Sequence, residues 1–224
     1  MRLDICIQST SMEVIPYNHQ PALTAVVNKW LGANNKWHGV SSTYAFSMLG
    51  GGKAVKVFGG ITFPQGATLT ISAHDSDMIY SVVENLSRSP KLFKGLVVRE
   101  VFIIADPDLS DREIFFPTSP ILLKQWVEGQ KNPRHVIYTD EQASDLLTEK
   151  FRTKLNRIGL SDPTARLTFA PEAGKHQTKL ITYRNIKNRT SWCPIRIEGT
   201  PTTKLFAWNT GVGNSTGIGF GAIK

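Results

Sequence analysis

A glycine-rich segment near the C-terminus is the part of the sequence whose residue types and spacing best suit a chemical role. It runs from Gly211 to Gly221 and contains five glycines, with Asn214, Ser215 and Thr216 in its middle. Glycine lets a backbone approach a ligand closely, and consecutive N–H groups in such a loop can hold a phosphate. Neither a Gly-Lys-Ser/Thr sequence nor a helix follows, so neither a P-loop nor a dinucleotide-binding turn is indicated. The alternative is a tight glycine turn between a helix and the last strand.

Two of the five histidines are candidates for proton transfer, because the ordinary pKa of histidine lies near 6.5. His38 lies in a polar loop after the first predicted helix, where functional residues are often found. His19 lies close to the start of that helix, where a capping or packing role is favoured. A lone loop histidine is more often a solvated side chain than a catalytic one, so residue type alone leaves both interpretations open.

Positive charge is concentrated in the second half of the chain, and the formal net charge of the whole is +8. Residues 1–110 hold 9 Lys/Arg against 8 Asp/Glu, whereas residues 111–224 hold 17 against 10. Such an asymmetry favours an acidic partner, most often nucleic acid. A predicted turn between two strands adds to it, with Arg184, Lys187 and Arg189 around the turn and Arg196 further along. That turn either contacts RNA or is an ordinary solvated hairpin tip.

Other chemistries have little support in the sequence. The only two cysteines, Cys6 and Cys193, lack the spacing of zinc ligands, so we expect no metal site and no cofactor. No apolar run approaches the roughly 18 residues that span a membrane. The N-terminus has the pattern of a first strand and not of a signal peptide. We therefore expect a cytoplasmic protein without a membrane partner.

In the first half of the chain, the sequence pattern predicts secondary structure in the order strand, helix, strand, strand, helix, strand. Residues 3–8 alternate between apolar and polar, and a helix follows from Pro21 to Leu31 with its apolar residues on one face. Strands are expected at 44–49, 54–58 and 67–73. A second helix at about 76–86 and a strand at 96–104 complete the unit.

The second half repeats this order less clearly, after a break at Asp106-Pro107-Asp108. A long helix to about Ile158 is expected, begun by a capping box of Thr139 and Gln142. A strand pair at 180–183 and 191–197, a short helix after Thr200 and a last strand at 218–223 follow. The sequence thus predicts an α+β fold of tandem ferredoxin-like (RRM-like) domains, βαββαβ twice, with domains at 1–105 and 112–224.

Three segments resemble one known family. Gly-Val-Gly at 211–213 and Gly-Phe-Gly at 219–221, five residues apart, are similar to the C-terminal glycine signature of the repeat-associated RNA-binding (RAMP) proteins of CRISPR systems. Ile-Pro-Tyr-Asn-His-Gln at 15–20 and Trp37-His38 followed by Tyr-Ala-Phe-Ser at 44–47 narrow the resemblance. Together they resemble the CRISPR-associated endoribonucleases that mature guide RNA, the sixth numbered family of Cas proteins.

This resemblance implies a metal-independent endoribonuclease that cuts CRISPR precursor RNA within its repeats. The 2′-hydroxyl beside the scissile phosphate attacks it, which leaves 2′,3′-cyclic phosphate and 5′-hydroxyl ends and produces mature guide RNA. His38 matches the catalytic histidine of the family, and Lys36, Lys53 and His19 are secondary candidates. Repeat RNA, as precursor and as mature guide, is the implied partner. A CRISPR effector complex and a homodimer remain open.

The glycine segment and the basic turn are the implied RNA contacts. Within the segment these are Gly211, Gly213, Asn214, Ser215, Thr216, Gly219 and Gly221, and around the turn they are Arg184, Lys187, Arg189 and Arg196.

The sequence departs from the best-known members of that family at two positions. Asn28 stands where those members have a tyrosine, and Ser42 stands where they have a lysine. The group that stabilises the phosphorane is therefore not identified, although Lys36, Lys53 and Lys56 are near in sequence. Two alternatives stay open: a repeat-RNA-binding protein of the same superfamily that does not cut, and an unrelated enzyme that uses the glycine loop for a nucleotide.

Overall fold

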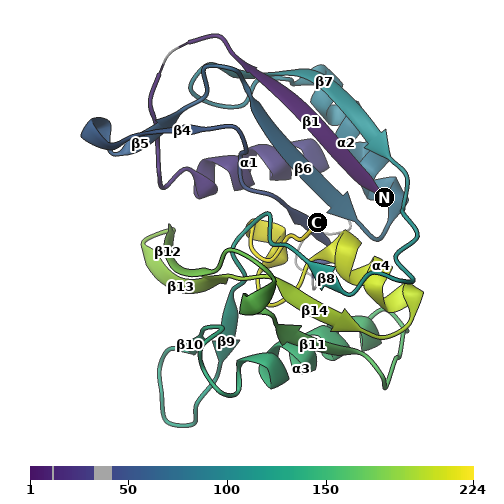
Figure 1. The fold of residues 1–224 in the computed structure, drawn as a ribbon. Coiled ribbons are helices and arrows are strands. Elements are labelled where there is room, and N and C mark those ends of the chain that lie inside the picture. The colour runs from purple at the N-terminus through teal and green to yellow at the C-terminus, as the bar shows by residue number, and fades with distance from the viewer. Residues whose placement is uncertain (12, 33–41) are drawn as a thin grey trace.

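The computed structural model describes residues 1–11, 13–32 and 42–224, which form two stacked halves (Figure 1). Predictions for Lys36, Trp37 and His38 therefore fall outside the described residues. No helix in the described part of the chain is long and apolar enough to cross a lipid bilayer. Two separate cores of buried side chains support the halves, one drawn from residues 3–96 and the other from residues 109–223.

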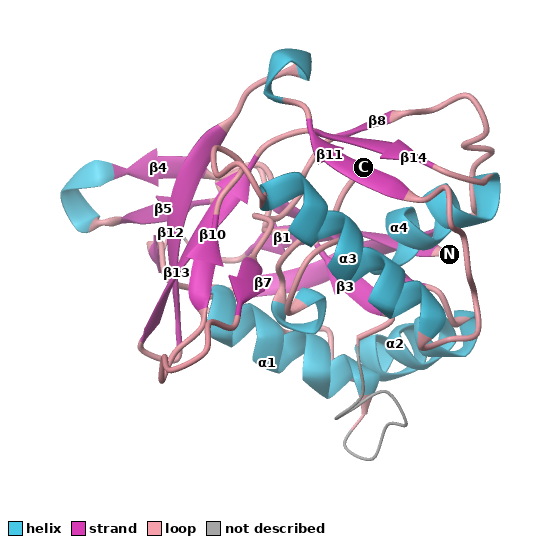
Figure 2. Ribbon diagram, turned by 90° about the horizontal axis from the view of Figure 1, so that it is seen from below, coloured by secondary structure: helices cyan, strands magenta, loops and turns pink. Residues whose placement is uncertain are grey.

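The first half is a ferredoxin-like βαββαβ unit, as predicted. Its four strands pair antiparallel in the order β3-β6-β1-β7, so that Leu3 of β1 lies between Ile71 and Ile103. Helices α1 and α2 pack on the same face of this sheet (Figure 2). The elements are β1 (Arg2–Ser9), α1 (Gln20–Leu31), β3 (Tyr44–Phe46), β6 (Ala67–Ala73), α2 (Ser76–Arg88) and β7 (Leu96–Ile104).

A small three-stranded sheet forms a projecting finger beside this unit. It consists of β2 (Ile15–Pro16), β4 (Lys53–Val55) and β5 (Gly60–Thr62). The strand expected at 54–58 was wrong, because β4 ends at Val55 and a 3₁₀ turn, Lys56–Phe58, follows. The turn reverses the chain at Gly59, whose φ of +59° favours glycine.

The second half repeats the ferredoxin-like order with two inserted hairpins. Its sheet order is β11-β14-β8, and Ile223 adds a single bridge to Pro117 beside β8. Helix α4 follows Thr200, as predicted, and the Thr200 side chain caps it by accepting the N–H of Thr203. The core elements are β8 (Ile114–Phe115), α3 (Ala143–Asn156), β11 (Arg166–Phe169), β14 (Ile195–Glu198) and α4 (Pro201–Thr210). The hairpins are β9 (Leu123–Gln125) with β10 (Arg134–Val136), and β12 (Gln177–Tyr183) with β13 (Ile186–Trp192).

Three local predictions in this half were wrong. The capping box is absent, because α3 is capped by Gln142 without a side-chain hydrogen bond. The strand predicted at 191–197 divides between β13 and β14, which belong to different sheets. The last strand is replaced by a 3₁₀ turn at Thr216–Ile218 and the single bridge at Ile223, because the glycines of this segment turn the chain instead of extending it.

The predicted domain boundary, residues 106–111, falls in the connection between β7 and β8. The two halves contact each other on either side of this connection, and the buried Arg2 of β1 makes several of these contacts. Its guanidinium donates hydrogen bonds to the carbonyls of Trp208 and of Ile223, the latter at 2.6 Å. It also stacks on the Trp208 ring, 3.4 Å from the ring centroid. Arg2 thus ties the first strand of one half to the last helix and the C-terminus of the other.

We expect Arg2→Ala to lower the free energy of unfolding by about 3 kcal/mol. The change leaves two buried carbonyls without a donor and removes a cation–π contact. Urea denaturation followed by circular dichroism measures the effect. Arg88→Ala is the control, because the Arg88 side chain is 70% exposed and its ion pair is with Glu84, one turn away on α2. Equal losses in the two variants would contradict a special role for Arg2.

Candidate nucleic-acid interface

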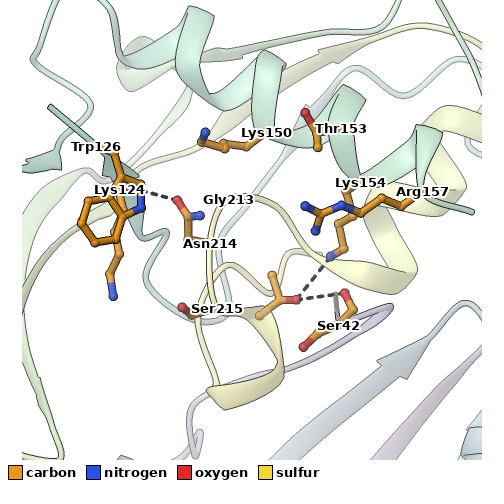
Figure 3. A pocket seen from close by; sticks show the side chains of 11 residues that line it. Ser42, Lys124, Trp126, Lys150, Thr153, Lys154, Arg157, Gly213, Asn214 and Ser215 are labelled. Carbon is orange, nitrogen blue, oxygen red and sulfur yellow. Dashed lines mark hydrogen bonds between the residues drawn. The ribbon is translucent and has the colours of Figure 1, made fainter. Parts of the chain in front are cut away.

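A basic cavity of about 430 Å³ lies where the glycine-rich segment meets helix α3 (Figure 3). The segment contributes residues 213–216 to its wall, and α3 with its C-cap contributes Lys150, Thr153, Lys154 and Arg157. Lys124 and Trp126, at the end of β9, form another side of the cavity. Ser42, from the first half of the chain, completes it. The cavity therefore joins four segments that are distant in the sequence.

The cavity carries strong positive charge. Its lining includes Lys124, Lys150, Lys154 and Arg157, whereas no Asp or Glu is among the described residues that line it. One of these cations is partly neutralised, since Lys150 donates to the exposed Glu149 at 3.2 Å. Lys124, Lys150 and Arg157 around one opening attract an anion such as a phosphate group. The side chain of Lys154 is buried, and its Nζ is bonded within the protein.

The backbone of the glycine segment adds uncommitted donors to this charge. The N–H groups of Val212, Asn214, Ile218, Gly219 and Gly221 donate to protein carbonyls. Those of Gly213, Ser215 and Thr216 have no acceptor among the described residues. Gly213 and Ser215 both have left-handed backbone conformations, with φ of +77° and +63°. Adjacent free N–H groups in such a turn form a small anion-binding concavity.

Three of the glycines predicted to contact RNA are instead deeply buried. A Cβ at Gly211 would lie 2.6 Å from the carbonyl oxygen of Gly221, and one at Gly219 would lie 2.6 Å from the ring of Phe46. At Gly221 it would overlap the carbonyl oxygen of Val212. These glycines are needed for packing, while RNA contact at any of the three stays an untested prediction.

Side chains from both halves hold the segment in place. Gln20, at the start of α1, donates to the carbonyls of Ile218 and Gly219 at 2.8 and 2.6 Å. The Tyr44 hydroxyl of β3 donates to Gly217 at 3.2 Å, and burial raises the pKa of this phenol to about 12. From the other half, Asn214 Oδ1 accepts the backbone N–H of Lys124 at 2.8 Å. Hydrogen bonds from both halves of the chain thus fix the conformation of this turn.

Trp126 provides an aromatic surface at the rim of the cavity. Its side chain is 72% exposed, which is unusual for tryptophan. An exposed indole beside lysines is the arrangement on which nucleic-acid bases stack.

The predicted catalytic residues are not brought together by the described part of the structure. His38 and Lys36 lie outside it, although Ser42 of the cavity is only four residues beyond His38 in sequence. Lys53 is exposed on β4 of the finger and does not line the cavity. His19 is 5% exposed, and its Nδ1 lies 2.9 Å from the carbonyl oxygen of Pro16. Burial lowers the pKa of His19, so the structure favours a packing role for it.

The predicted RNA-contacting arginines and lysine divide into two groups. Arg184, Lys187 and Arg189 are exposed on the β12–β13 hairpin, whose turn has left-handed residues at Arg184 and Asn185. Both views place this hairpin at the same end of the molecule as the β4–β5 finger (Figures 1 and 2). Arg196 lies on β14 instead and forms a 2.5 Å ion pair with Glu113. The hairpin is therefore a free basic surface, whereas Arg196 already has an anionic partner.

Six residues that line the cavity, Thr153 of α3 among them, were not predicted from the sequence. The basic residues Lys150, Lys154 and Arg157 are visible as the polar side of a helix, but nothing in that pattern distinguishes a cavity wall from a solvated face. Lys124 and Trp126 lie in a hairpin whose position depends on the tertiary fold. In the part of the chain that the structure describes, no group of three or more His, Cys, Asp or Glu side chains gathers to hold a metal ion.

Comparison with known proteins identifies one group of relatives. The family model described as "CRISPR associated protein Cas6, C-terminal" matches residues 104–224, just over half of the chain. The chain is also similar to a curated protein, CRISPR-associated endoribonuclease Cas6 1 of Methanocaldococcus jannaschii. The two are 27% identical over 235 residues, which cover 100% of this chain and 92% of the relative.

Solved structures share the fold over the whole chain. One, described as "Characterization of a Cas6-related gene from Pyrococcus furiosus", has a TM-score of 0.88 and 22% identity, and covers 100% of this chain and 97% of that one. Another, described as "An RAMP protein binding different RNA substrates", has a TM-score of 0.87 and 20% identity, with 100% and 98% covered. At these identities the likeness establishes the tandem ferredoxin-like fold.

Proposed function

Because the chain belongs to the Cas6 family of CRISPR-associated proteins, we propose that it cleaves CRISPR precursor RNA within the repeats and so produces guide RNA in the cytoplasm. The observation that carries this proposal is the basic cavity beside the glycine segment. It combines the cations Lys124, Lys150 and Arg157 with unpaired backbone N–H groups and an exposed tryptophan, which suit phosphates and an unpaired base. The M. jannaschii relative is named an endoribonuclease, which supports the same activity here.

The proposed reaction needs no metal ion. The 2′-hydroxyl of the nucleotide before the cut attacks the adjacent phosphorus, and the bond from phosphorus to the leaving 5′-oxygen breaks. A base takes the proton of the 2′-hydroxyl and an acid gives a proton to the 5′-oxygen, which leaves 2′,3′-cyclic phosphate and 5′-hydroxyl ends. His38 is the proposed proton-transfer residue, and positive charge together with backbone N–H groups stabilises the phosphorane.

Labelled repeat RNA incubated with the protein in EDTA tests the proposal. We expect cleavage at one position in the repeat, with a cyclic phosphate on the upstream product. Binding without cleavage would favour the alternative of a repeat-RNA-binding protein that does not cut. If the protein neither binds nor cleaves the RNA, both the proposed function and this alternative are contradicted.

RNA affinity should fall steeply as salt rises, because each phosphate contact releases counterions. We expect Lys124→Ala and Lys150→Ala each to reduce the slope of log K against log salt concentration by about 0.7, the value for one contact to a single strand. Filter binding at several salt concentrations measures this slope. Arg88→Ala, on the exposed side of α2, should leave it unchanged. An affinity that does not change between low and moderate salt would contradict the cavity as a phosphate site.

A further inference from the structure

The ammonium of Lys154 is buried at the junction of three segments. The residue is 7% exposed and lies in the last turn of α3. Its Nζ donates to the carbonyl oxygens of Thr210 at 2.6 Å and Gly211 at 3.4 Å, and to Thr216 Oγ1 at 3.2 Å. The two carbonyls end helix α4, where the helix dipole favours a cation. All three N–H bonds of the protonated lysine are therefore used.

Thr216 extends this network to the other half of the chain. Its hydroxyl donates to the carbonyl oxygen of Ser42 at 3.4 Å, next to the Ser42 side chain in the cavity wall (Figure 3). Ser42 and the glycine segment are in close contact, since a Cβ at Gly217 would collide with Ser42 Oγ. The chain of donors from Lys154 through Thr216 to Ser42 thus crosses from α3 to the segment that precedes β3.

A hydroxyl has only one proton, and this makes the network directional. While Lys154 is protonated, the Thr216 hydroxyl accepts a hydrogen bond from Nζ and donates its own hydrogen bond to the carbonyl oxygen of Ser42. A neutral amine has a lone pair and only two N–H bonds, and Thr216 is the one partner of the three that can donate to it. Deprotonation of Lys154 therefore turns the Thr216 hydroxyl away from Ser42.

We propose that Lys154 is a positioning residue, which through Thr216 holds Ser42 and the glycine turn in the arrangement that receives an RNA phosphate. Among the described residues, the ionisable groups that share the cavity with it are Lys150 on α3, Arg157 at the C-cap of α3 and Lys124 on β9. The Tyr44 phenol on β3 contacts the glycine segment. Burial lowers the pKa of Lys154 to about 7. A phosphate in the cavity raises that pKa, so RNA binding and protonation of Lys154 favour each other.

This inference rests on the proposed function only in the experiments that measure RNA cleavage or RNA binding. Thr216→Val removes the hydroxyl with little change in volume, Thr216→Ser restores it, and Lys154→Met removes the ammonium. Lys204→Met is the control, because Lys204 is also 7% exposed and donates to the carbonyl of Ser110 at 2.7 Å, but does not line the cavity. Single-turnover cleavage at saturating protein and the Kd for repeat RNA are measured from pH 5.5 to 9.

We expect Thr216→Val and Lys154→Met to lower the saturated rate about tenfold, the effect of a misplaced substrate phosphate, with a much smaller change in Kd. In the wild type, one component of the saturated rate falls as pH rises, at a pH above 7, because the bound phosphate raises the pKa of Lys154 above its value of about 7 in the RNA-free protein. This pH-dependent component of the rate should be absent in Thr216→Val and Lys154→Met. It should be present in Thr216→Ser and Lys204→Met. A wild-type rate and pH profile in Thr216→Val would overturn the proposal, even if Lys154→Met failed to fold.

The RNA-free protein provides a test that survives failure of the proposed function. The methyl resonance of Thr216 should titrate with a midpoint near pH 7 in the wild type, and should not do so in Lys154→Met. If wild-type protein does not cleave RNA but this titration is present, the proposed function fails and the network stands. A Thr216 resonance that does not change between pH 5.5 and 9 would overturn the inference.

Discussion

Replacement of His38 by alanine is expected to reduce the single-turnover rate of RNA cleavage by roughly 10²–10⁴-fold, the contribution of a positioned general acid or base. The affinity for repeat RNA should change little, because one imidazole adds little to an interface with many phosphate contacts. Gel-based cleavage with protein in excess separates the rate from the affinity. His38 lies outside the described residues, so this prediction depends on its match to the family and on its closeness in sequence to Ser42 of the cavity.

His19→Ala is the matched control for this prediction. His19 is buried against the Pro16 carbonyl at the start of α1, so its loss should lower stability more than the cleavage rate. RNA with a 2′-deoxy nucleotide before the cut should bind and stay intact, because its nucleophile is missing. An active His38→Ala with an inactive His19→Ala would move the proton transfer to His19. Cleavage of the deoxy substrate would exclude 2′-hydroxyl attack.

The sequence predicted the first half of the fold well because its patterns are local. In β1 the alternating residues Leu3, Ile5 and Ile7 are all buried, as a period of two requires. In α1 Pro21 opens the helix, and its apolar stripe, including Trp30, faces the core. Each of these elements buries one face regardless of its neighbours, so its pattern is enough to identify it.

The end of the chain could not be predicted in the same way. Residues 218–223 alternate like a strand, yet Thr216–Ile218 forms a 3₁₀ turn and Gly219 and Gly221 have left-handed φ values. What decides this conformation is contact with distant residues, such as the two carbonyls that accept from Gln20. A propensity argument does not include those contacts.

Most residues of the cavity could not be predicted from local sequence patterns either. In the sequence, Lys154 is one of several basic residues on a helix that otherwise looks solvent-facing. It becomes buried only because the end of α4 and the glycine segment pack over that helix face. The glycine motif lies beside the cavity, but its individual glycines have different structural roles. Gly213 lines the cavity, whereas Gly211, Gly219 and Gly221 are buried by close contacts.

That division predicts a large loss of stability for Gly221→Ala. Gly221 has a φ of +68°, and an added Cβ would overlap the carbonyl oxygen of Val212, a backbone atom that cannot move aside without disturbing the core. We expect the free energy of unfolding to fall by about 4 kcal/mol, from the left-handed backbone and from overpacking together. Urea denaturation of the RNA-free protein measures this loss without reference to any activity.

Gly129→Ala separates the two causes of that loss. Gly129 has a similar φ of +78°, but an added Cβ would meet nothing within 4 Å. Its replacement should therefore cost only the backbone contribution, about 1 kcal/mol. If the two variants lost the same stability, backbone conformation alone would explain the glycine at 221. If Gly221→Ala loses several times more stability than Gly129→Ala, close packing is the main reason for glycine at 221. The two ends of the glycine segment then pack directly against each other, and this contact places Gly213 and the unpaired N–H groups at the cavity.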